Sequence, residues 1–254
     1  MIMPAPNTHP KCLARSGRTL LFLVVLETHT ACGARSALEA PNSGSRAADQ
    51  GTNNEPATSG TPSTACQKGT RVIAITAGGD HSCALFCDGA ARCWGGPDTP
   101  HPLPVLNLSA AQAIAAGEDY ACALISGGTV ACWGNNFFGQ LGDGSQHSSP
   151  TPVQVLNLHS VTAISAGSTH TCALLSDGTV ACWGNNVSSG RGNVTLTASS
   201  TPVAVIGLHG VASVSAGYAH NCAVLSDSTV ACWGSSYLGD GTTTGSLTPV
   251  RVSN

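Results

Sequence analysis

Charged residues are scarce in this sequence, and basic ones are scarcest in its regular part. Lys, Arg, Asp and Glu together make up 9% of the 254 residues. Seven of the ten Lys and Arg residues lie at or before Arg71, which leaves Arg92, Arg191 and Arg251 against nine acidic residues in the remainder. A protein that binds nucleic acid needs basic patches to neutralise phosphates. The composition therefore argues against a nucleic-acid partner.

Familiar catalytic motifs are also missing. The chain has no Gly-x-Ser-x-Gly elbow, no phosphate-binding glycine loop and no His-Glu-x-x-His. Asp143 and Asp240 lie in Leu-Gly-Asp-Gly turns, where Asp ordinarily caps the backbone. We therefore expect a non-enzymatic protein without a cofactor. The alternative, an extracellular hydrolase, would need an acid and a base that converge in space.

No hydrophobic run is long enough to span a bilayer as a mature helix. The apolar run at residues 19–26 follows three basic residues, which is the order of a secretory signal: Lys11, Arg15 and Arg18. We expect residues 1–32 to be this signal and the protein to be exported, with a membrane contact only through a lipid anchor.

The signal ends in Ala31-Cys32, which resembles the end of a bacterial lipoprotein signal. Lipidation of Cys32 would tie the protein to the cell envelope. Glu27 and His29 occupy places where that signal usually has small or apolar residues, so ordinary cleavage and secretion is the alternative. Residues 33–70 are rich in Ser, Thr, Gly and Pro without an apolar period, which predicts a disordered tether.

Residues 71–254 consist of one unit repeated four times. The copies are AGGDHSCALFCDGAARCWG from Ala77, AGEDYACALISGGTVACWG from Ala116, AGSTHTCALLSDGTVACWG from Ala166 and AGYAHNCAVLSDSTVACWG from Ala216. The last three begin 50 residues apart. A period of this length indicates stacked modules or propeller blades, whose faces need neighbours to be buried.

Each copy contains a predicted β-hairpin. In the third, apolar runs at 172–175 and 179–183 flank a three-residue loop in which Gly178 supplies the positive φ. This register places Cys172 opposite Cys182 and puts apolar residues on both faces, so both faces should be covered by neighbours. Two more strands are expected, at 161–166 and in the Thr-Pro-Val-x-Val segments 151–155, 201–205 and 248–252. We therefore predict an all-β protein of propeller-type blades, each with four antiparallel strands.

The repeated pattern closely resembles the regulator of chromosome condensation repeat. The resemblance rests on Ala-Gly, His, Ala-Leu, Ser-Asp-Gly-Thr-Val and Trp-Gly-Asn-Asn, and on Gly-Gln-Leu-Gly-Asp-Gly at 139–144. It implies a β-propeller that serves as a protein-binding platform. In that family the propeller has seven blades and is best known as the exchange factor of the Ran GTPase; bacterial secreted relatives include an inhibitor protein of β-lactamases.

The chain departs from the family pattern in its length. Only about four repeats are present, and the first copy lies 39 residues before the second without the segment that corresponds to 139–144. We expect an open arc, a smaller ring or a truncated product. The resemblance also leaves a guanine nucleotide exchange factor for a small GTPase as an alternative function.

The 12 cysteines include four pairs with C-x9-C spacing. They are Cys83 and Cys93, Cys122 and Cys132, Cys172 and Cys182, and Cys222 and Cys232. Opposed residues in an antiparallel pair lie within disulfide range, whereas a zinc site needs shorter knuckles that converge. We expect four hairpin disulfides and no metal. Cys66 and Cys87 remain and should pair, the alternative being a free or intermolecular Cys66.

His81, His170 and His220 recur at one position, where the second copy has Tyr120. Because Tyr keeps a hydrogen-bonding tip but is no metal ligand here, we expect a structural hydrogen bond that holds the loop before the hairpin. The four tryptophans also recur, which predicts packing between blades.

The segment after each Trp-Gly differs between copies, as binding loops do. For Phe138 and Leu238 the alternative is a packing role, while three residues of types enriched at binding hot spots are the candidates for contact with a protein partner: Phe137, Tyr237 and Arg191. We therefore expect an exported, envelope-tethered binding platform whose partner the sequence does not name.

Overall fold

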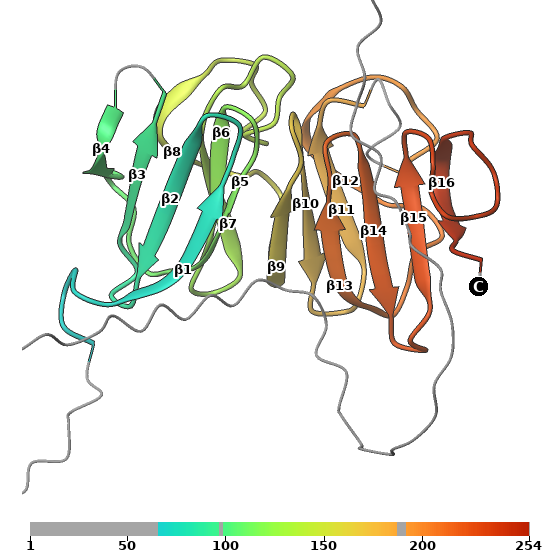
Figure 1. Ribbon diagram of the computed structural model, residues 1–254, viewed down its shortest axis with the longest axis horizontal. Coiled ribbons are helices and arrows are strands. Elements are labelled where there is room, and N and C mark those ends of the chain that lie inside the picture. The colour runs from blue at the N-terminus through green and yellow to red at the C-terminus, as the bar shows by residue number, and fades with distance from the viewer. Residues whose placement is uncertain (1–65, 97–98, 187–191, 254) are drawn as a thin grey trace, which may run out of the picture. The chain divides into compact units, whose positions relative to one another are not determined.

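The repeats fold into four separate sheets, each of four antiparallel strands (Figure 1). The computed structural model describes residues 66–96, 99–186 and 192–253. The predicted signal, the tether up to residue 65, Cys32 and Arg191 lie outside the described residues. None of the described residues belongs to a helix long and apolar enough to cross a membrane.

Strands follow one another in sequence order within each sheet, and each sheet is one blade. The first blade contains β1 (Val72–Ala77), β2 (His81–Phe86), β3 (Ala91–Gly95) and β4 (Thr99–Pro104). The second contains β5 (Ala111–Ala116), β6 (Tyr120–Ile125), β7 (Thr129–Gly134) and β8 (Ser149–Gln154). The third contains β9 (Val161–Ala166), β10 (His170–Leu175), β11 (Val180–Gly184) and β12 (Ser199–Ala204). The fourth contains β13 (Val211–Ala216), β14 (His220–Leu225), β15 (Val230–Gly234) and β16 (Ser246–Arg251).

The predicted hairpin register is confirmed. In the third blade Cys172 pairs with Cys182 and Leu174 with Val180, and Gly178 has a φ of 77°. A residue with a side chain is strained at that φ, so the glycine allows the short loop to close. Because side chains alternate along a strand, this one register decides which residues face each neighbouring blade.

The two faces of the third blade pack against different neighbours. Cys172, Leu174 and Val180 share a buried cluster with Val211 and Trp233 of the fourth blade. On the opposite face Ala173, Ala181 and Trp183 share a cluster with residues of the second blade: Cys122, Leu124, Val130 and Cys132. The tryptophan of each later blade thus packs toward the blade before it, which confirms the predicted packing between blades and adds its direction.

The fourth strands of the second, third and fourth blades begin two residues earlier than expected, at Ser149, Ser199 and Ser246. In the second blade β8 starts at Ser149, which pairs with Gly134, and ends at Gln154. Val155 was expected to end the strand but lies just beyond it; its amide still donates to the carbonyl oxygen of Val130 at 2.9 Å, and the residue is only 2% exposed. The side chain of Val155 packs in the buried cluster between the second and third blades. The Thr-Pro-Val-x-Val pattern therefore marks both the end of a strand and the residue that follows it into the core.

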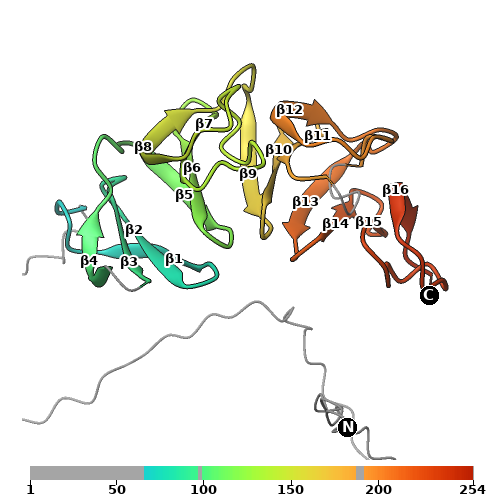
Figure 2. The ribbon, with the colours of Figure 1, turned by 90° about the horizontal axis from the view of Figure 1, so that it is seen from above.

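The blades stand side by side along an open arc (Figure 2). Strand β5 packs on β1 and β2, β9 on β5 and β6, and β13 on β9 and β10. The first strand of each blade therefore lies on the inside of the arc. In the described part of the chain the first and fourth blades do not meet, which confirms the prediction of an incomplete propeller.

The outward faces of the two end blades are exceptions to the expectation that both faces of every blade are covered. On the first blade Ile75 is 71% exposed, and Arg92 stands where the other copies have alanine. The guanidinium carbon of Arg92 lies 5.5 Å from the ring centre of Phe86, a cation–π contact that covers part of this face. On the fourth blade Val224 is 41% exposed, whereas the equivalent Leu174 is 6% exposed. The repeat pattern predicts that these faces are buried, but a face is buried only where a neighbouring blade packs against it.

Candidate partner-binding face

Two sets of loops lie together at one end of the blades, which we call the upper face. The inner loops join the first and second strands of each blade, at 78–80, 117–119, 167–169 and 217–219. The outer loops join the third and fourth strands, and those described include 135–148 and 235–245. Antiparallel topology brings both sets to the same end, as Figure 1 shows at the top. The hairpin tips, such as Ser176–Gly178, lie at the opposite end, which we call the lower face.

Backbone hydrogen bonds tie each outer loop to the inner loop of its own blade. The amide of Asn135 donates to the carbonyl oxygen of Asp119 at 2.9 Å, and the amide of Ser235 donates to that of Ala219 at 3.0 Å. Other backbone bonds tie the inner loops of neighbouring blades together. The amide of Glu118 donates to the carbonyl oxygen of Ser168 at 3.0 Å, and the amide of Ser168 donates to that of Tyr218 at 3.3 Å. The upper face is therefore a connected surface across blades.

The glycine of the repeated Ala-Gly pair makes room for the ring three residues later. A Cβ atom on Gly117 would lie 2.0 Å from the ring of Tyr120, and one on Gly167 would lie 2.3 Å from the ring of His170. No heavier residue fits unless the ring moves. The pair thus lets the aromatic side chain fold back under the inner loop, where it can reach the next blade.

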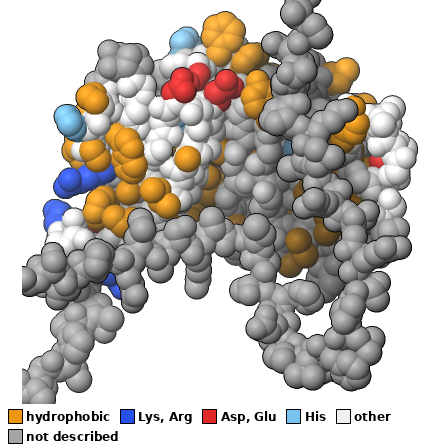
Figure 3. Space-filling model, in the orientation of Figure 1, with side chains coloured by type: hydrophobic (Ala, Val, Ile, Leu, Met, Phe, Trp, Pro, Cys, Tyr) orange, Lys and Arg blue, Asp and Glu red, His pale blue; other side chains and the backbone are white. Residues whose placement is uncertain are grey.

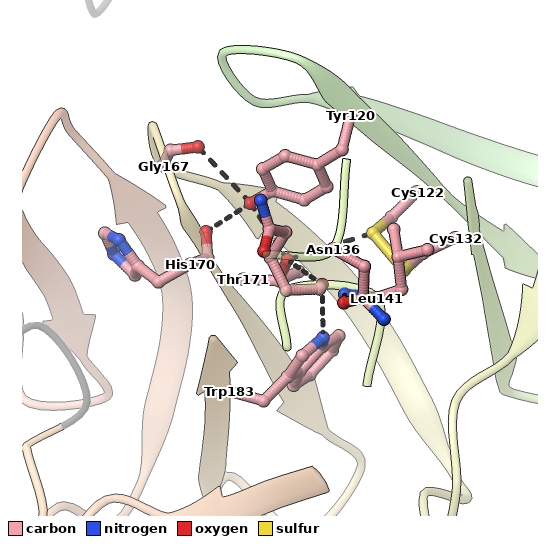
Figure 4. Close-up of a disulfide and its surroundings, with 10 residues drawn as sticks. Tyr120, Cys122, Cys132, Asn136, Leu141, Gly167, His170, Thr171 and Trp183 are labelled. Carbon is pink, nitrogen blue, oxygen red and sulfur yellow. Dashed lines mark hydrogen bonds between the residues drawn. A yellow bond between two sulfur atoms is a disulfide. The ribbon is translucent and has the colours of Figure 1, made fainter. Parts of the chain in front are cut away.

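The repeated His or Tyr position forms hydrogen bonds across blades (Figure 4). The Tyr120 hydroxyl donates to the carbonyl oxygen of His170, lies 3.3 Å from that of Gly167, and accepts a hydrogen bond from Thr171 at 3.0 Å. His170 in turn donates from Nε2 to Oδ1 of Asn221 in the fourth blade at 3.0 Å. The expected structural bond is present, but it joins neighbouring blades and does not hold the loop of its own blade.

Burial changes the acidity of both groups. It lowers the pKa of His170 below its ordinary value, an effect that the bond to Asn221 only partly offsets, and it raises the pKa of Tyr120. Both side chains are therefore neutral at pH 7. Among residues 66–96, 99–186 and 192–253, no three His, Cys, Asp or Glu side chains gather in a way that could hold a metal ion.

The outer loop of the second blade is organised around the buried amide of Asn136. Its Nδ2 donates to Oδ1 of Asp143 and to the carbonyl oxygen of His147, both at 3.1 Å, and its Oδ1 accepts from the amide of Leu141 at 2.9 Å. Asp143 also accepts from the amide of Ser145 at 3.0 Å, the capping role predicted for it. This network holds the loop that carries Phe137.

The same loop is held to the third blade by Trp183. Its indole N–H donates to the carbonyl oxygen of Gln140 at 2.8 Å. In Figure 4, Asn136, Leu141 and Trp183 lie beside the Cys122–Cys132 disulfide and the bonds of Tyr120. The scaffold below the upper face is thus continuous from the second blade to the third.

The structure exposes two of the three predicted contact residues on the upper face. The side chain of Phe137 is 75% exposed and that of Tyr237 81%, while Arg191 lies outside the described residues. Phe138 is half-buried, with its ring edge-on to that of Phe137 at 5.8 Å. Leu238 is 3% exposed, so it has the packing role.

The sequence analysis missed two residues of the inner loops, Glu118 and Tyr218. Tyr218 is 74% exposed, and Glu118 is also exposed. The residue after the Ala-Gly pair varies between copies, since Gly79 and Ser168 occupy the corresponding positions, and this variation could have indicated both residues from the sequence.

Three hollows open on the upper face. One of about 390 Å³ is lined by the Ala-Gly pairs of all four blades. A second, of about 300 Å³, lies between the second, third and fourth blades and is lined in part by Glu118, Phe138, His170 and Tyr218. A third, of about 250 Å³, is bordered by Phe137 and Phe138. The exposed residues Phe137 and Tyr218 therefore border concave surface.

The inner loops of the upper face carry acidic residues. Asp80, Glu118 and Asp119 lie in the inner loops of the upper face, and Figure 3 shows acidic side chains along this edge. At the lower face Arg251 forms a salt bridge with Asp227 of a hairpin tip at 3.1 Å. This is the only salt bridge within the described ranges. Asp80, Glu118 and Asp119 thus have no basic partner in the described structure.

The structure joins ten cysteines as five disulfides. The four hairpin pairs, Cys83–Cys93, Cys122–Cys132, Cys172–Cys182 and Cys222–Cys232, have Cα atoms 4.0 to 4.1 Å apart. Cys66 and Cys87 have Cα atoms 5.7 Å apart, and their bond ties the start of the described chain to the first hairpin tip. All lie within the strands or at the lower face, so they support the upper face without forming part of it.

Comparisons with known proteins agree with this architecture. Two family models described as Regulator of chromosome condensation (RCC1) repeat match the chain, one at residues 127–174 and the other at 72–98, 111–140, 161–191 and 211–240. A comparison with curated proteins found no match.

Solved structures with the same fold include two propellers. Prp20p from Saccharomyces cerevisiae, described with its binding to Gsp1p and histones, is 23% identical, with a TM-score of 0.66 over 72% of this chain and 50% of that protein. Human WBSCR16 is 22% identical, with a TM-score of 0.65 over 74% of this chain and 55% of that protein. The chain therefore spans about half the length of these proteins, and the likeness concerns the fold.

Proposed function

The chain belongs to the regulator of chromosome condensation repeat family, and on this premise we propose that it is a non-enzymatic binding protein whose upper face holds a protein partner. The observation that carries the proposal is the exposure of Phe137, Tyr218 and Tyr237, each at least 74% accessible, on loops of one face. Large aromatic side chains on rigid supports are typical anchors of protein interfaces. The hydrogen-bonded loops beneath Phe137 supply such a support.

The ionisable groups under this face favour binding over catalysis. Tyr120 and His170 have shifted pKa values, which often mark catalytic groups. Here both are buried and engaged in bonds between blades, so neither is placed to exchange a proton with a substrate. Their role is to hold neighbouring blades together.

The charge of the face selects the kind of partner. Asp80, Glu118 and Asp119 form no salt bridge within the described residues and favour a partner that presents basic side chains, since complementary charge speeds and orients association. The partners of Prp20p are not carried over to this chain, because 23% identity supports the fold alone.

The site of action in this proposal is outside the cytoplasm. The basic and apolar pattern of residues 1–32 supports export, Cys32 supports a lipid anchor in the envelope, and five disulfides suit an oxidising compartment. Fractionation with mass spectrometry of the amino terminus tests this part. Cytoplasmic protein with an intact amino terminus would contradict export and favour the exchange-factor alternative.

The binding function is tested by affinity capture of envelope and secreted proteins on the purified repeat domain. Three immobilised forms are compared: wild type, the double variant Phe137→Ala with Tyr237→Ala, and Leu106→Ala. Leu106 is 63% exposed in the connection between the first two blades, at the lower face, and serves as a matched control. The proposal expects a protein that binds the wild type and the Leu106 variant but not the double variant. No captured protein, or one that binds all three forms equally, would contradict it.

A further inference from the structure

The 300 Å³ hollow between the second, third and fourth blades has a wall chemistry of its own. Glu118 comes from the second blade's inner loop, Phe138 from its outer loop, and Tyr218 from the inner loop of the fourth blade. His170 of the third blade lies beneath them and is 2% exposed. Two aromatic rings and one carboxylate thus border a space at the lower end of the volumes found for ligand pockets, about 300 to 1,000 Å³. We call this hollow the acidic aromatic cleft.

The charge of the acidic aromatic cleft comes from one group. The Glu118 side chain is exposed and forms no salt bridge with any residue of the described chain. Burial keeps His170 neutral by lowering its pKa, so among the described residues that line the cleft none opposes the carboxylate with a positive charge. The polar residues Ser168 and Thr169 complete the wall without adding charge. A bound cation would therefore gain the attraction of Glu118, and no lining residue of the described chain would repel it.

The aromatic residues favour the same class of ligand. Phe138 is half-buried with its ring braced edge-on by Phe137, and Tyr218 is 74% exposed. The face of an aromatic ring attracts a cation within about 6 Å, and a neighbouring carboxylate adds to this attraction. An apolar side chain could use the rings alone, and an anion would be repelled by Glu118. A long side chain with a cationic end uses every wall of the cleft.

We propose that the acidic aromatic cleft receives a lysine or arginine side chain of the protein partner. The methylene groups of that side chain would lie against Phe138 and Tyr218, and its ammonium or guanidinium group beside Glu118. The inference rests on the proposed binding function and names one contact within it. Because the lining residues come from three blades, the cleft exists only in the assembled arc.

The cleft is tested without knowledge of the partner. Small probes are titrated into isotope-labelled repeat domain and amide chemical shifts are followed: N-acetyl-lysine methylamide, N-acetyl-arginine methylamide and the uncharged N-acetyl-norleucine methylamide. We expect either cationic probe to shift the amides of 118, 168–170 and 218 and to bind at least threefold more tightly than the norleucine probe. Equal affinity for all three probes, or shifts confined to other residues, would overturn the proposal.

Two charge variants complete the test. Glu118→Gln removes the carboxylate while leaving the backbone bonds of residue 118 intact, and should weaken the cationic probes at least threefold. Asp177→Asn removes the same charge from a lower hairpin tip and keeps an acceptor for Thr179; it should change affinity less than twofold. An unchanged affinity in Glu118→Gln would overturn the cleft. If the captured partner still depends on Phe137 and Tyr237 in that case, the binding function stands and the lysine or arginine contact alone has failed.

Discussion

The Nε2 atom of His170 lies 3.0 Å from Oδ1 of Asn221, and this bond joins the third blade to the fourth. Both side chains are buried, at 2% and 0% exposure. The equivalent residue of the second blade, Tyr120, bonds to the backbone of the third blade. At this repeat position a tyrosine or a histidine forms the hydrogen bond to the next blade, and only the histidine can titrate near neutral pH.

Stability should fall in weak acid because of His170. Its pKa is lowered by burial from the ordinary 6.5, so the unfolded chain binds a proton below about pH 6.5 that the folded chain refuses. The contribution is fully present above pH 6.5 and is lost as the pH falls through and below that value. One such group changes the free energy of unfolding by at most about 1.4 kcal/mol for each pH unit. Chemical denaturation at pH 7.5 and pH 5.5 measures the difference.

The variant His170→Tyr provides the control, since tyrosine already occupies this position in the second blade. Its loss of stability between pH 7.5 and pH 5.5 should be smaller than that of the wild type. The remaining histidines are unchanged, so the difference isolates residue 170. Identical pH dependence in the two proteins would contradict a neutral His170.

Loss of the Asn136 network should destabilise the protein strongly. Asn136→Ala leaves the buried amide of Leu141 without its acceptor, and each such group costs about 1 to 3 kcal/mol. We expect a loss of about 2 to 4 kcal/mol in urea unfolding. The control is Ser236→Ala, at the equivalent position of the fourth blade, where the residue is exposed; its expected change is under about 0.5 kcal/mol. Similar losses in both variants would show that the network is not the cause.

Binding and folding should depend on different aromatic residues. Phe137→Ala or Tyr237→Ala should weaken partner binding by about 2 kcal/mol or more while leaving the unfolding midpoint nearly unchanged. Trp183 is 0% exposed, so Trp183→Ala should cost about 3 to 5 kcal/mol of stability. Calorimetric titration and thermal unfolding of the same samples measure both effects. A destabilised Phe137 variant with normal affinity would reverse the assignment.

The hairpin cysteines should be oxidised in the natural protein. Closing an 11-residue loop contributes about 2.5 to 3 kcal/mol in the chain-entropy model, and each hairpin pair is separated by 10 positions. Peptide mapping without reductant should find each of the four linked peptides. Replacing Cys172 and Cys182 together by Ala should lower stability by about that amount, whereas free thiols in protein from the envelope would contradict the prediction.

The pairing of Cys66 with Cys87 has its own readout. The structure places Cys87 at the first hairpin tip, where the other copies have serine, so its loss should not disturb the packing between blades. A non-reducing digest should contain a peptide that links residues 66 and 87. A bond from Cys87 to Cys83 or Cys93 would contradict both this pair and the register of the first hairpin.

The sequence alone determined the blade. The 50-residue period marks the repeated unit, while the alternation along the strands and the glycine of the hairpin loop act within a few residues, so Cys172 could be placed opposite Cys182 and Trp183 on the opposite face. The sequence also predicted that the side chain at the His or Tyr position forms a structural hydrogen bond, although not which residue it bonds to. The fourth strand was misplaced by up to two residues because pairing with the third strand, and burial of Val155, decide where it begins and ends.

The tertiary structure decided what happens between blades. The hydrogen bond of His170 leads to Asn221, 51 positions away, and the acidic aromatic cleft combines Glu118, Phe138 and Tyr218 from two blades that flank a third. No local pattern encodes such neighbours, because the angle and order of stacking follow from how whole faces pack. The same reason explains the end blades: Arg92 and Val224 stand at positions that the repeat marks as buried, and they are exposed because burial there requires a further blade.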